Sequence, residues 1–195
     1  MQRRSDHYTA KAKGEGYPAR SVFKLKEIQL KFQLLKPGGR VLDLGAAPGS
    51  WSMYALEIAG PRGRVVAVDL TPLSIPAGAH NLIALTGDIF DPEVAAGISA
   101  EAPYDLVLCD AAPSTTGNRL VDTSRSEALV ERAVELARLY LAPGGGLAVK
   151  IFQGSEQRRL FEGLRAMFES CKAFKPQASR SESFETYFVG VGKRG

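Results

Sequence analysis

Cysteine and histidine are scarce in this 195-residue chain, which contains two of each. Two cysteines cannot form the disulfide framework of a small secreted protein, and two histidines cannot build a zinc cluster. We therefore expect no bound metal and no disulfide scaffold. Because a free cysteine is among the most buried residue types, Cys109 is interpreted as a core residue.

Long apolar runs are also absent. The longest stretch without a charged residue, 70–87, has the length of a membrane span, but it contains Pro72, Pro76 and Gly78. We interpret it as a loop followed by a strand. Residues 1–6 read MQRRSD and place no apolar segment behind the two arginines, so no secretory signal is predicted. These features favour a cytoplasmic protein that makes no contact with a membrane.

Hydrophobic residues make up 45% of the chain and charged residues 24%, which is typical of a folded globular protein. No repeat, low-complexity tract or long linker divides the sequence. We expect one domain over residues 1–195, with a basic N-terminal arm and helix in residues 1–40.

Charge is distributed unevenly along the chain. Residues 1–40 hold ten Lys and Arg against three Asp and Glu, a balance of +7 within a whole-chain charge of +4. Aromatic residues alternate with these basic residues at Tyr8, Tyr17, Phe23 and Phe32. This mixture of basic and aromatic residues is typical of a surface that binds a phosphate backbone with unstacked bases beside it. A solvated basic face with aromatic residues in the core accounts for the mixture equally well.

From residue 41 onward, strand and helix patterns alternate. Near-continuous apolar strands separated by helices predict a parallel sheet covered by helices on both faces. The clearest helix begins near Ser124, which has capping-box spacing with Glu127. The expected strands are 41–44, 64–70, 81–85, 104–109, 146–152, 171–174 and 185–191. The expected helices are a stretch that follows Gly45 and ends near Ala59, 124–141 and 156–168.

Acidic residues follow four of these strands, at or near their ends: Asp43, Asp69, Asp88 and Asp110. Ligands of open parallel sheets bind outside the carboxyl ends of the strands. Lys150 lies near the end of a further, otherwise apolar strand, where a lysine is costly without a function. The sequence therefore predicts a functional site at this edge.

The turn after the first strand is built from small residues. Gly45, Ala47, Pro48 and Gly49 would let the backbone approach a ligand, and the start of the next helix would present free N–H groups to it. The stretch GAAPGS does not match the G-x-G-x-x-G pattern of a dinucleotide site.

Two of the acids are suited to a nucleoside. Asp69, which ends the second strand, could bind both hydroxyls of a ribose. Asp88 could accept from an adenine amine, with Ile89 beside it to cover the ring. A nucleoside bound without a phosphate cradle points to S-adenosylmethionine rather than to a dinucleotide.

Six segments distributed over nearly the whole chain form a recognisable set: 17–28, 43–51, 109–113, 149–154, 179–181 and 185–187. Together they resemble the FtsJ/RrmJ (RlmE) family of S-adenosylmethionine-dependent ribose 2′-O-methyltransferases, which act on large-subunit ribosomal RNA. Two departures are Ser50, where a second glycine is common, and Cys109, where serine is common.

The resemblance implies a Rossmann-like methyltransferase fold, with a mostly parallel seven-stranded sheet, an antiparallel last strand and helices on both faces. It places the family's catalytic set on Lys24, Asp110, Lys150 and Glu185. Together with the turn residues, the expected contacts to the cofactor are Gly45, Ala47, Pro48, Gly49, Trp51, Asp69, Asp88, Ile89 and Asp110.

Deprotonating a ribose hydroxyl gives a reason for two lysines. An ordinary lysine, with a pKa of about 10.4, is protonated at neutral pH and cannot act as a base. A second lysine, partial burial and a sulfonium would all favour the neutral amine. We assign Lys150 as the base and expect Lys24 to steer the 2′-hydroxyl, because on a helix it lies near Ile28, whereas Lys26 would face outward.

Asp110 would hold the reacting groups near the methyl carbon, and Glu185 would orient Lys24 or the ribose. If the last strand runs antiparallel to the others, its start at Glu185 lies on the same edge as Asp110 and Lys150. Without that orientation Glu185 would be an ordinary surface acid.

Other functions fit less well. Cytosine-5 methyltransferases need a nucleophilic cysteine after the fourth strand, usually beside a proline, but Pro113 is followed by Ser114. Base-amine methyltransferases carry an Asp/Asn-Pro-Pro-aromatic stretch at this site, and residues 110–113 lack the aromatic residue. A non-enzymatic RNA-binding module would be expected to have lost a lysine or an acid of the catalytic set.

The substrate expected from the resemblance is a nucleotide of 23S-type ribosomal RNA, with a uridine as the methylated residue. The RNA could be free or within the assembled subunit. The alternative is an anticodon-loop ribose of tRNA. The enzyme is expected to be a monomer.

Overall fold

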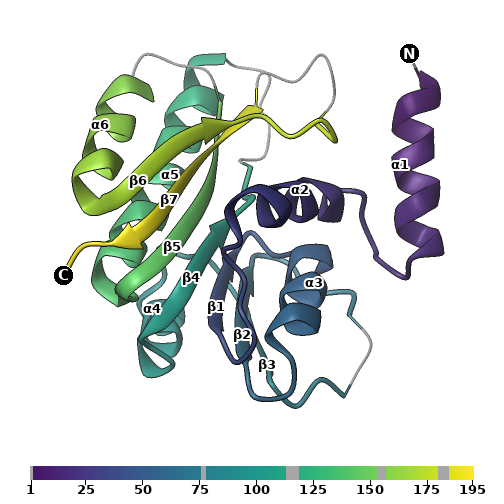
Figure 1. The fold of residues 1–195 in the computed structure, drawn as a ribbon, viewed down its shortest axis with the longest axis horizontal. Helices are drawn as coiled ribbons and strands as arrows, with labels where there is room; N and C mark the ends of the chain where they lie inside the picture. The colour runs from purple at the N-terminus through teal and green to yellow at the C-terminus, as the bar shows by residue number, and fades with distance from the viewer. Residues whose placement is uncertain (1, 76–77, 113–118, 153–156, 180–184) are drawn as a thin grey trace.

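Seven strands form one mixed sheet in the computed structural model, which describes residues 2–75, 78–112, 119–152, 157–179 and 185–195 (Figure 1). The strand order is β3-β2-β1-β4-β5-β7-β6. The strands are β1 (Arg40–Leu44), β2 (Arg64–Asp69), β3 (Leu82–Thr86), β4 (Tyr104–Cys109), β5 (Leu141–Phe152), β6 (Phe168–Phe174) and β7 (Glu185–Lys193).

Strands β1 to β5 run parallel to one another, and only β7 is reversed, pairing antiparallel with β5 on one side and β6 on the other. The fold is therefore the predicted methyltransferase-like α/β sheet. Because β7 is reversed, its first residue, Glu185, pairs with Phe152 at the carboxyl end of β5.

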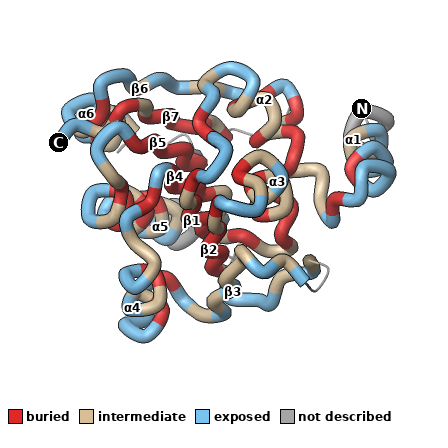
Figure 2. Tube along the Cα trace, turned by 60° about the horizontal axis from the view of Figure 1, so that its bottom comes forward, coloured by how far each residue is buried: buried red, intermediate tan, exposed pale blue. Residues whose placement is uncertain are grey.

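Helices cover both faces of the sheet, as predicted. One core cluster lies between the sheet and α4 (Pro92–Ala100), α5 (Arg119–Tyr140) and α6 (Gln157–Met167). The other lies under α2 (Val22–Phe32) and α3 (Ser50–Ala59). The strands are mostly buried and the outer helix faces are exposed (Figure 2). Helix α1 (Gln2–Gly14) extends to one side of this body (Figure 1).

Three expected boundaries differ from the structure by three residues or more. Helix α5 begins at Arg119, so Ser124 lies inside the helix and does not cap it. Strand β5 begins at Leu141, before the predicted start at Gly146. Strand β6 begins at Phe168, three residues before the predicted start. Both strands are extended by pairing with a neighbour, Leu141 with Tyr104 of β4 and Phe168 with Lys193 of β7.

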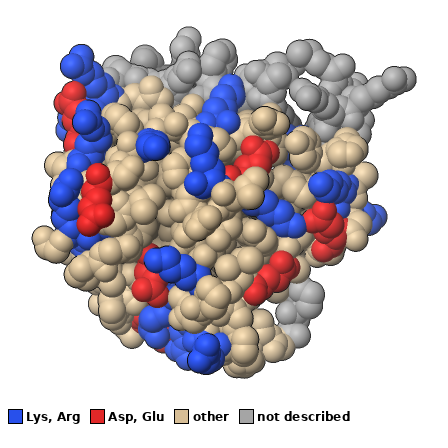
Figure 3. Space-filling model, viewed as in Figure 1, with Lys and Arg blue, Asp and Glu red and all other residues tan. Residues whose placement is uncertain are grey.

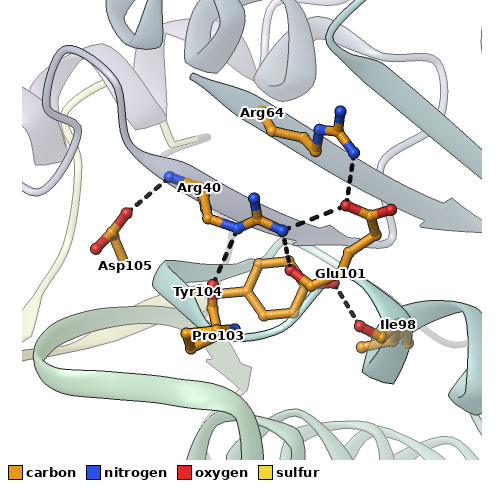
Figure 4. A network of polar contacts seen from close by, with 7 residues as sticks. All are labelled: Arg40, Arg64, Ile98, Glu101, Pro103, Tyr104 and Asp105. Atoms are coloured by element: carbon orange, nitrogen blue, oxygen red, sulfur yellow. Dashed lines mark hydrogen bonds and ion pairs between the residues drawn. The ribbon is translucent and has the colours of Figure 1, made fainter. Parts of the chain in front are cut away.

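Ionic contacts join the strands at the opposite, amino-terminal edge of the sheet (Figure 4). Arg40 and Arg64 both form ion pairs with Glu101, at N–O distances of 3.3 and 2.8 Å. The backbone N–H of Arg40 donates to Asp105, and the hydroxyl of buried Tyr104 donates to the carbonyl of Ile98. These contacts fix β1, β2 and β4 against one another far from the edge where the predicted site lies.

Candidate functional site

A pocket of about 590 Å³ opens at the carboxyl ends of β1, β2 and β4. This volume is within the range of small-ligand sites. Its lining combines carboxylates with apolar side chains: Gly45, Ala47, Val68, Asp69, Leu70, Gly87, Asp88, Ile89, Phe90, Asp110, Ala111, Ala112, Arg125, Ala128 and Leu129.

Six of the nine residues expected to contact the cofactor line this pocket: Gly45, Ala47, Asp69, Asp88, Ile89 and Asp110. Pro48, Gly49 and Trp51 are not among its lining residues. Gly49 instead packs against Ile75, and the Pro48 carbonyl accepts from the N–H of Ser74.

The carboxylate of Asp69 joins two sides of the pocket. Its Oδ2 atom accepts a hydrogen bond from the Ala47 N–H at 2.9 Å. Its Oδ1 atom accepts from the N–H and the hydroxyl of Thr71, at 2.9 and 3.0 Å. These bonds fix the position of the carboxylate beside the small-residue turn.

Gly45 is required by close packing. Its φ of 72° lies in the left-handed region, and a Cβ atom built there would lie 2.5 Å from the Cα of Ala111. The turn after β1 therefore touches the backbone that follows β4. This contact brings Asp110 to the wall of the pocket.

Trp51 lies in the core and is not among the residues that line the pocket, so its contact with a cofactor stays a prediction. It is buried, and its Nε1–H donates to the carbonyl of Ser21 at 2.8 Å. Its ring lies 5.8 Å from the ring of Tyr187, centroid to centroid. Trp51 thus connects the cofactor-loop helix α3 to the start of α2.

Two amines and two carboxyls from distant parts of the chain form close pairs beside the pocket. The Lys150 Nζ atom donates to the carbonyl of Asp110 at 2.6 Å and lies 3.1 Å from its Oδ1 atom. The Lys24 Nζ atom lies 2.7 Å from Oε1 of Glu185. All four side chains are largely buried, with exposed fractions between 7% and 15%.

Tyr187 connects the two pairs, and the sequence analysis did not assign it a role. Its hydroxyl donates to the Asp110 carboxylate at 2.6 Å, and the Lys24 amine lies 6.0 Å from its ring centroid. Burial and the nearby Asp110 carboxylate hold the pKa of Tyr187 well above its usual value. The phenol is therefore a neutral donor. The sequence did offer one indication of this role: Tyr187 lies two residues after Glu185 in a strand, and side chains at that spacing face the same side of a sheet.

Opposing effects act on Glu185. Burial raises the pKa of this carboxyl, but hydrogen bonds from Lys24 and Ser179 and the charges of Lys24 and Lys150 together lower it by more. The net pKa lies below the ordinary value, so Glu185 is a carboxylate at neutral pH.

Asp43, at the end of β1, is fully buried. Its Oδ2 atom accepts from the Ser52 hydroxyl at 2.6 Å, while Oδ1 has no hydrogen-bond partner among the described residues. Burial raises the pKa of Asp43 to about 7, and the nearby Asp110 and Asp69 charges add to this effect. This acid therefore differs from the others at the edge, which line the pocket.

Cys109 is buried and reduced. Burial raises the pKa of its thiol to about 12, so the thiol is protonated at neutral pH. A protonated core thiol is a poor nucleophile, in agreement with its assignment to the core.

Aromatic residues of the N-terminal arm pack internally, which differs from a base-stacking role. Tyr17 and Phe23 are buried in a small cluster with Ala12 and Ala178, and the Tyr17 hydroxyl donates to Glu57. Phe32 packs edge-on against Phe174.

Part of the arm's positive charge is paired. Lys26 does not face outward but lies 2.6 Å from Glu15 and over the Tyr17 ring. Lys11 lies 3.9 Å from the same carboxylate, whereas Lys13 is exposed. On the face of the molecule shown in Figure 3, basic and acidic side chains lie close to one another. The charge available to a polyanion on this face is thus smaller than the sequence balance implies.

The described ranges contain no group of three or more His, Cys, Asp or Glu arranged to bind a metal. No helix within the same ranges has the length and apolar character needed to cross a membrane. Three segments that carry the family resemblance lie partly outside the described residues. The parts concerned are 113, 153–154 and 180–181.

Comparison with known proteins places these features in one family. The profile of the FtsJ-like methyltransferases matches residues 17–193. Ribosomal RNA large subunit methyltransferase E of Treponema denticola is 50% identical over 190 residues, covering 97% of this chain and 96% of that protein. The protein of the same name from Syntrophobacter fumaroxidans is 50% identical over 192 residues, again covering 97% and 96%.

Solved structures agree with the sequence comparison. A ribosomal RNA methyltransferase from Plasmodium falciparum superposes with a TM-score of 0.78 and 27% identity, covering 92% of this chain and all of that one. Fibrillarin from Aeropyrum pernix, solved with bound S-adenosylmethionine, gives a TM-score of 0.61 at 20% identity, over 88% of this chain and 76% of that one. The second likeness concerns the fold.

Proposed function

The chain belongs to the FtsJ-like methyltransferase family, and on that premise we propose that it transfers a methyl group from S-adenosylmethionine to a ribose 2′-hydroxyl of large-subunit ribosomal RNA. The observation that supports this most directly is the convergence of Lys24, Asp110, Lys150 and Glu185 beside one pocket. A uridine is the proposed target nucleotide. A cytoplasmic location follows from the proposed substrate.

The pocket fits the proposed cofactor. Asp69 and Asp88 supply carboxylates for hydroxyl and amine donors, while Ile89 and Phe90 supply apolar surface for a ring. Asp110 adds negative charge where a cationic sulfur and ammonium need it. When bound, S-adenosylmethionine supplies an electrophilic methyl group and leaves as a neutral thioether.

In this mechanism Lys150 is the base that accepts the proton of the 2′-hydroxyl while the new oxygen–carbon bond forms and the carbon–sulfur bond breaks. Asp110 holds the Lys150 amine through two contacts, one to its main chain and one to its side chain. Lys24 donates to the ribose oxygen, and Glu185 fixes the direction of Lys24. Such orientation can contribute about 7 kcal/mol or more to catalysis.

Residues 1–40 are proposed to guide RNA to this edge. Helix α1 lies to one side of the body and is followed along the chain by α2, which carries Lys24 (Figure 1). Because the arm's aromatics are packed internally, we assign it an electrostatic role and no stacking role. The whole chain is proposed to act as one methyltransferase domain and as a monomer.

Incubation with labelled S-adenosylmethionine and separate ribosomal RNA, tRNA and large-subunit fractions tests this function. We expect label in large-subunit RNA, with the ribose methyl mapped to one uridine. Label confined to tRNA would favour the anticodon-loop alternative. No RNA label in any fraction, from a protein that binds the cofactor, would contradict the proposal.

A further inference from the structure

Three side chains along one side of α2 and the turn before it reach the same segment, residues 175–179, and the strand that follows it. The Arg20 guanidinium donates to the Ala178 carbonyl at 3.0 Å. Lys24 pairs with Glu185 at 2.7 Å. Glu27 accepts from the N–H groups of Gln177 and Ala178, at 2.6 and 2.9 Å.

Spacing explains why these side chains act together. Positions 20, 24 and 27 are separated by four and then three residues, so side chains at this spacing share one face of a helix. Of the residues they contact, 177–178 precede β7 along the chain and Glu185 is its first residue. The helix that carries Lys24 therefore also holds the chain that leads to Lys24's own partner.

Glu27 is suited to this task by its chemistry. One carboxylate accepts from two successive backbone N–H groups, and hydrogen bonds to a charged acceptor are stronger than neutral ones. These amides lie in a tight turn, because the Ser179 N–H donates to the Pro176 carbonyl at 3.1 Å. Ala178 is buried against Tyr17 and Phe23, so the turn is anchored on its apolar side as well.

We infer that Glu27 is a positioning residue for methyl transfer: it holds the 175–179 segment against α2 and so keeps Glu185 within reach of Lys24. The inference rests on the proposed function, because Glu185 matters only if the Lys24 pair serves catalysis. Glu27 itself does not line the pocket. Its loss should therefore affect turnover and not cofactor binding.

Glu27→Gln keeps the size of the side chain and removes its charge. We expect kcat for RNA methylation to fall about tenfold, since small misplacements of reacting groups are costly. The Kd for S-adenosylmethionine should stay within twofold, measured by calorimetry. Hydrogen exchange at the amides of residues 177 and 178 should accelerate, while amides of β1 and β4 exchange as before. Glu162→Gln, which removes an exposed carboxylate on α6, is the charge-matched control and should change none of these.

A second variant approaches the same contact from the other side. Residue 177 occupies the second position of the 176–179 turn, where proline is favoured. Gln177→Pro therefore preserves the turn and deletes one donor to Glu27. We expect this variant to lose about threefold in kcat. The double variant with Glu27→Gln should lose no more than Glu27→Gln alone.

Several results separate the inference from the function on which it rests. If the wild-type protein labels RNA but Glu27→Gln turns over at the wild-type rate, the positioning role is wrong and the proposed function stands. A parallel loss of kcat, cofactor affinity and protection across β1 and β4 would show that Glu27 supports only the fold, and would also overturn the inference. If the wild-type protein labels no RNA, the proposed function fails first.

Discussion

The Nζ atom of Lys150 is within 2.6 Å of the Asp110 carbonyl and 3.1 Å of its carboxylate. The two residues come from neighbouring parallel strands, since Cys109 pairs with Val149 in the register of β4 and β5. An amine that is 6% exposed thus has its position set by both the main chain and the side chain of one acid. Such a pair is held ready at the pocket before any substrate arrives.

Replacing Lys150 with alanine should abolish methyl transfer while leaving S-adenosylmethionine binding nearly unchanged. A general base typically contributes 10²- to 10⁴-fold to a rate, so we expect a loss of about this size. Single-turnover assays and calorimetry measure the two effects. Arg158→Ala, on an exposed part of α6, provides the control. Full residual activity in Lys150→Ala would exclude the lysine as the base.

Deleting residues 1–16 should weaken RNA binding and flatten its dependence on salt. Each phosphate contact that is lost lowers the slope of log K against log salt by about 0.7–0.9. Because buried Ala12 would be removed with the arm, the exposed Lys13 should also be replaced by alanine alone. That variant should lower the slope by less than one unit. An unchanged slope in the deletion would show that the arm does not contact the RNA backbone.

Substituting Asp43 with asparagine should remove a pH dependence of stability. The pKa of Asp43 is about 7 in the folded protein and close to 3.8 when exposed. Below pH 4 the carboxyl is protonated in both states, so it costs nothing. As pH rises from 4 to 7 only the unfolded chain ionises, and the free energy of unfolding falls by up to about 1.4 kcal/mol per pH unit.

Asp43→Asn cannot ionise, so its stability relative to wild type should increase between pH 4 and 7 and then level off. Urea denaturation at several pH values measures this difference. Asp91→Asn, at an exposed helix N-cap, is the control and should show a constant difference, because asparagine caps about as well as aspartate. A pH-independent difference for Asp43→Asn would contradict the raised pKa.

Trp51→Phe should separate a supporting role from contact with the cofactor. Phenylalanine keeps a ring against Tyr187 but loses the Nε1–H donor to the Ser21 carbonyl. The Ser21 carbonyl keeps the hydrogen bond from the Lys24 N–H, so the change removes one hydrogen bond, worth about 0.5–1.5 kcal/mol of stability. We expect that loss in denaturation experiments, a fewfold lower kcat, and a cofactor Kd within twofold of wild type. A Kd raised tenfold or more would instead place the indole at the ligand.

The sheet and the acids at its edge were predictable because parallel strands end together. Buried apolar runs closing on Asp69 and near Asp88 fix both the strand direction and the location of the pocket. The fold as a whole is the predicted one, including the reversed last strand.

Side-chain direction was less predictable. Trp51 follows the small-residue turn closely, but a shift of one residue along the helix, a rotation of about 100°, decides which way its side chain faces. Tyr17 and Phe23 alternate with lysines, and this pattern is typical both of an arm that binds bases and of a pair of packed helices. The structure has the packed arrangement. Contacts such as Tyr187 with Asp110 join residues 77 positions apart, and no local pattern encodes them.

The reversed strand β7 also determines the order in which the molecule can be completed. It is made after β5 and β6 but lies between them, so those two strands have no contact across the sheet until it arrives. Glu185 and Tyr187 come with it. The contacts of Glu185 with Lys24 and of Tyr187 with Asp110 can therefore form only once this last strand is inserted.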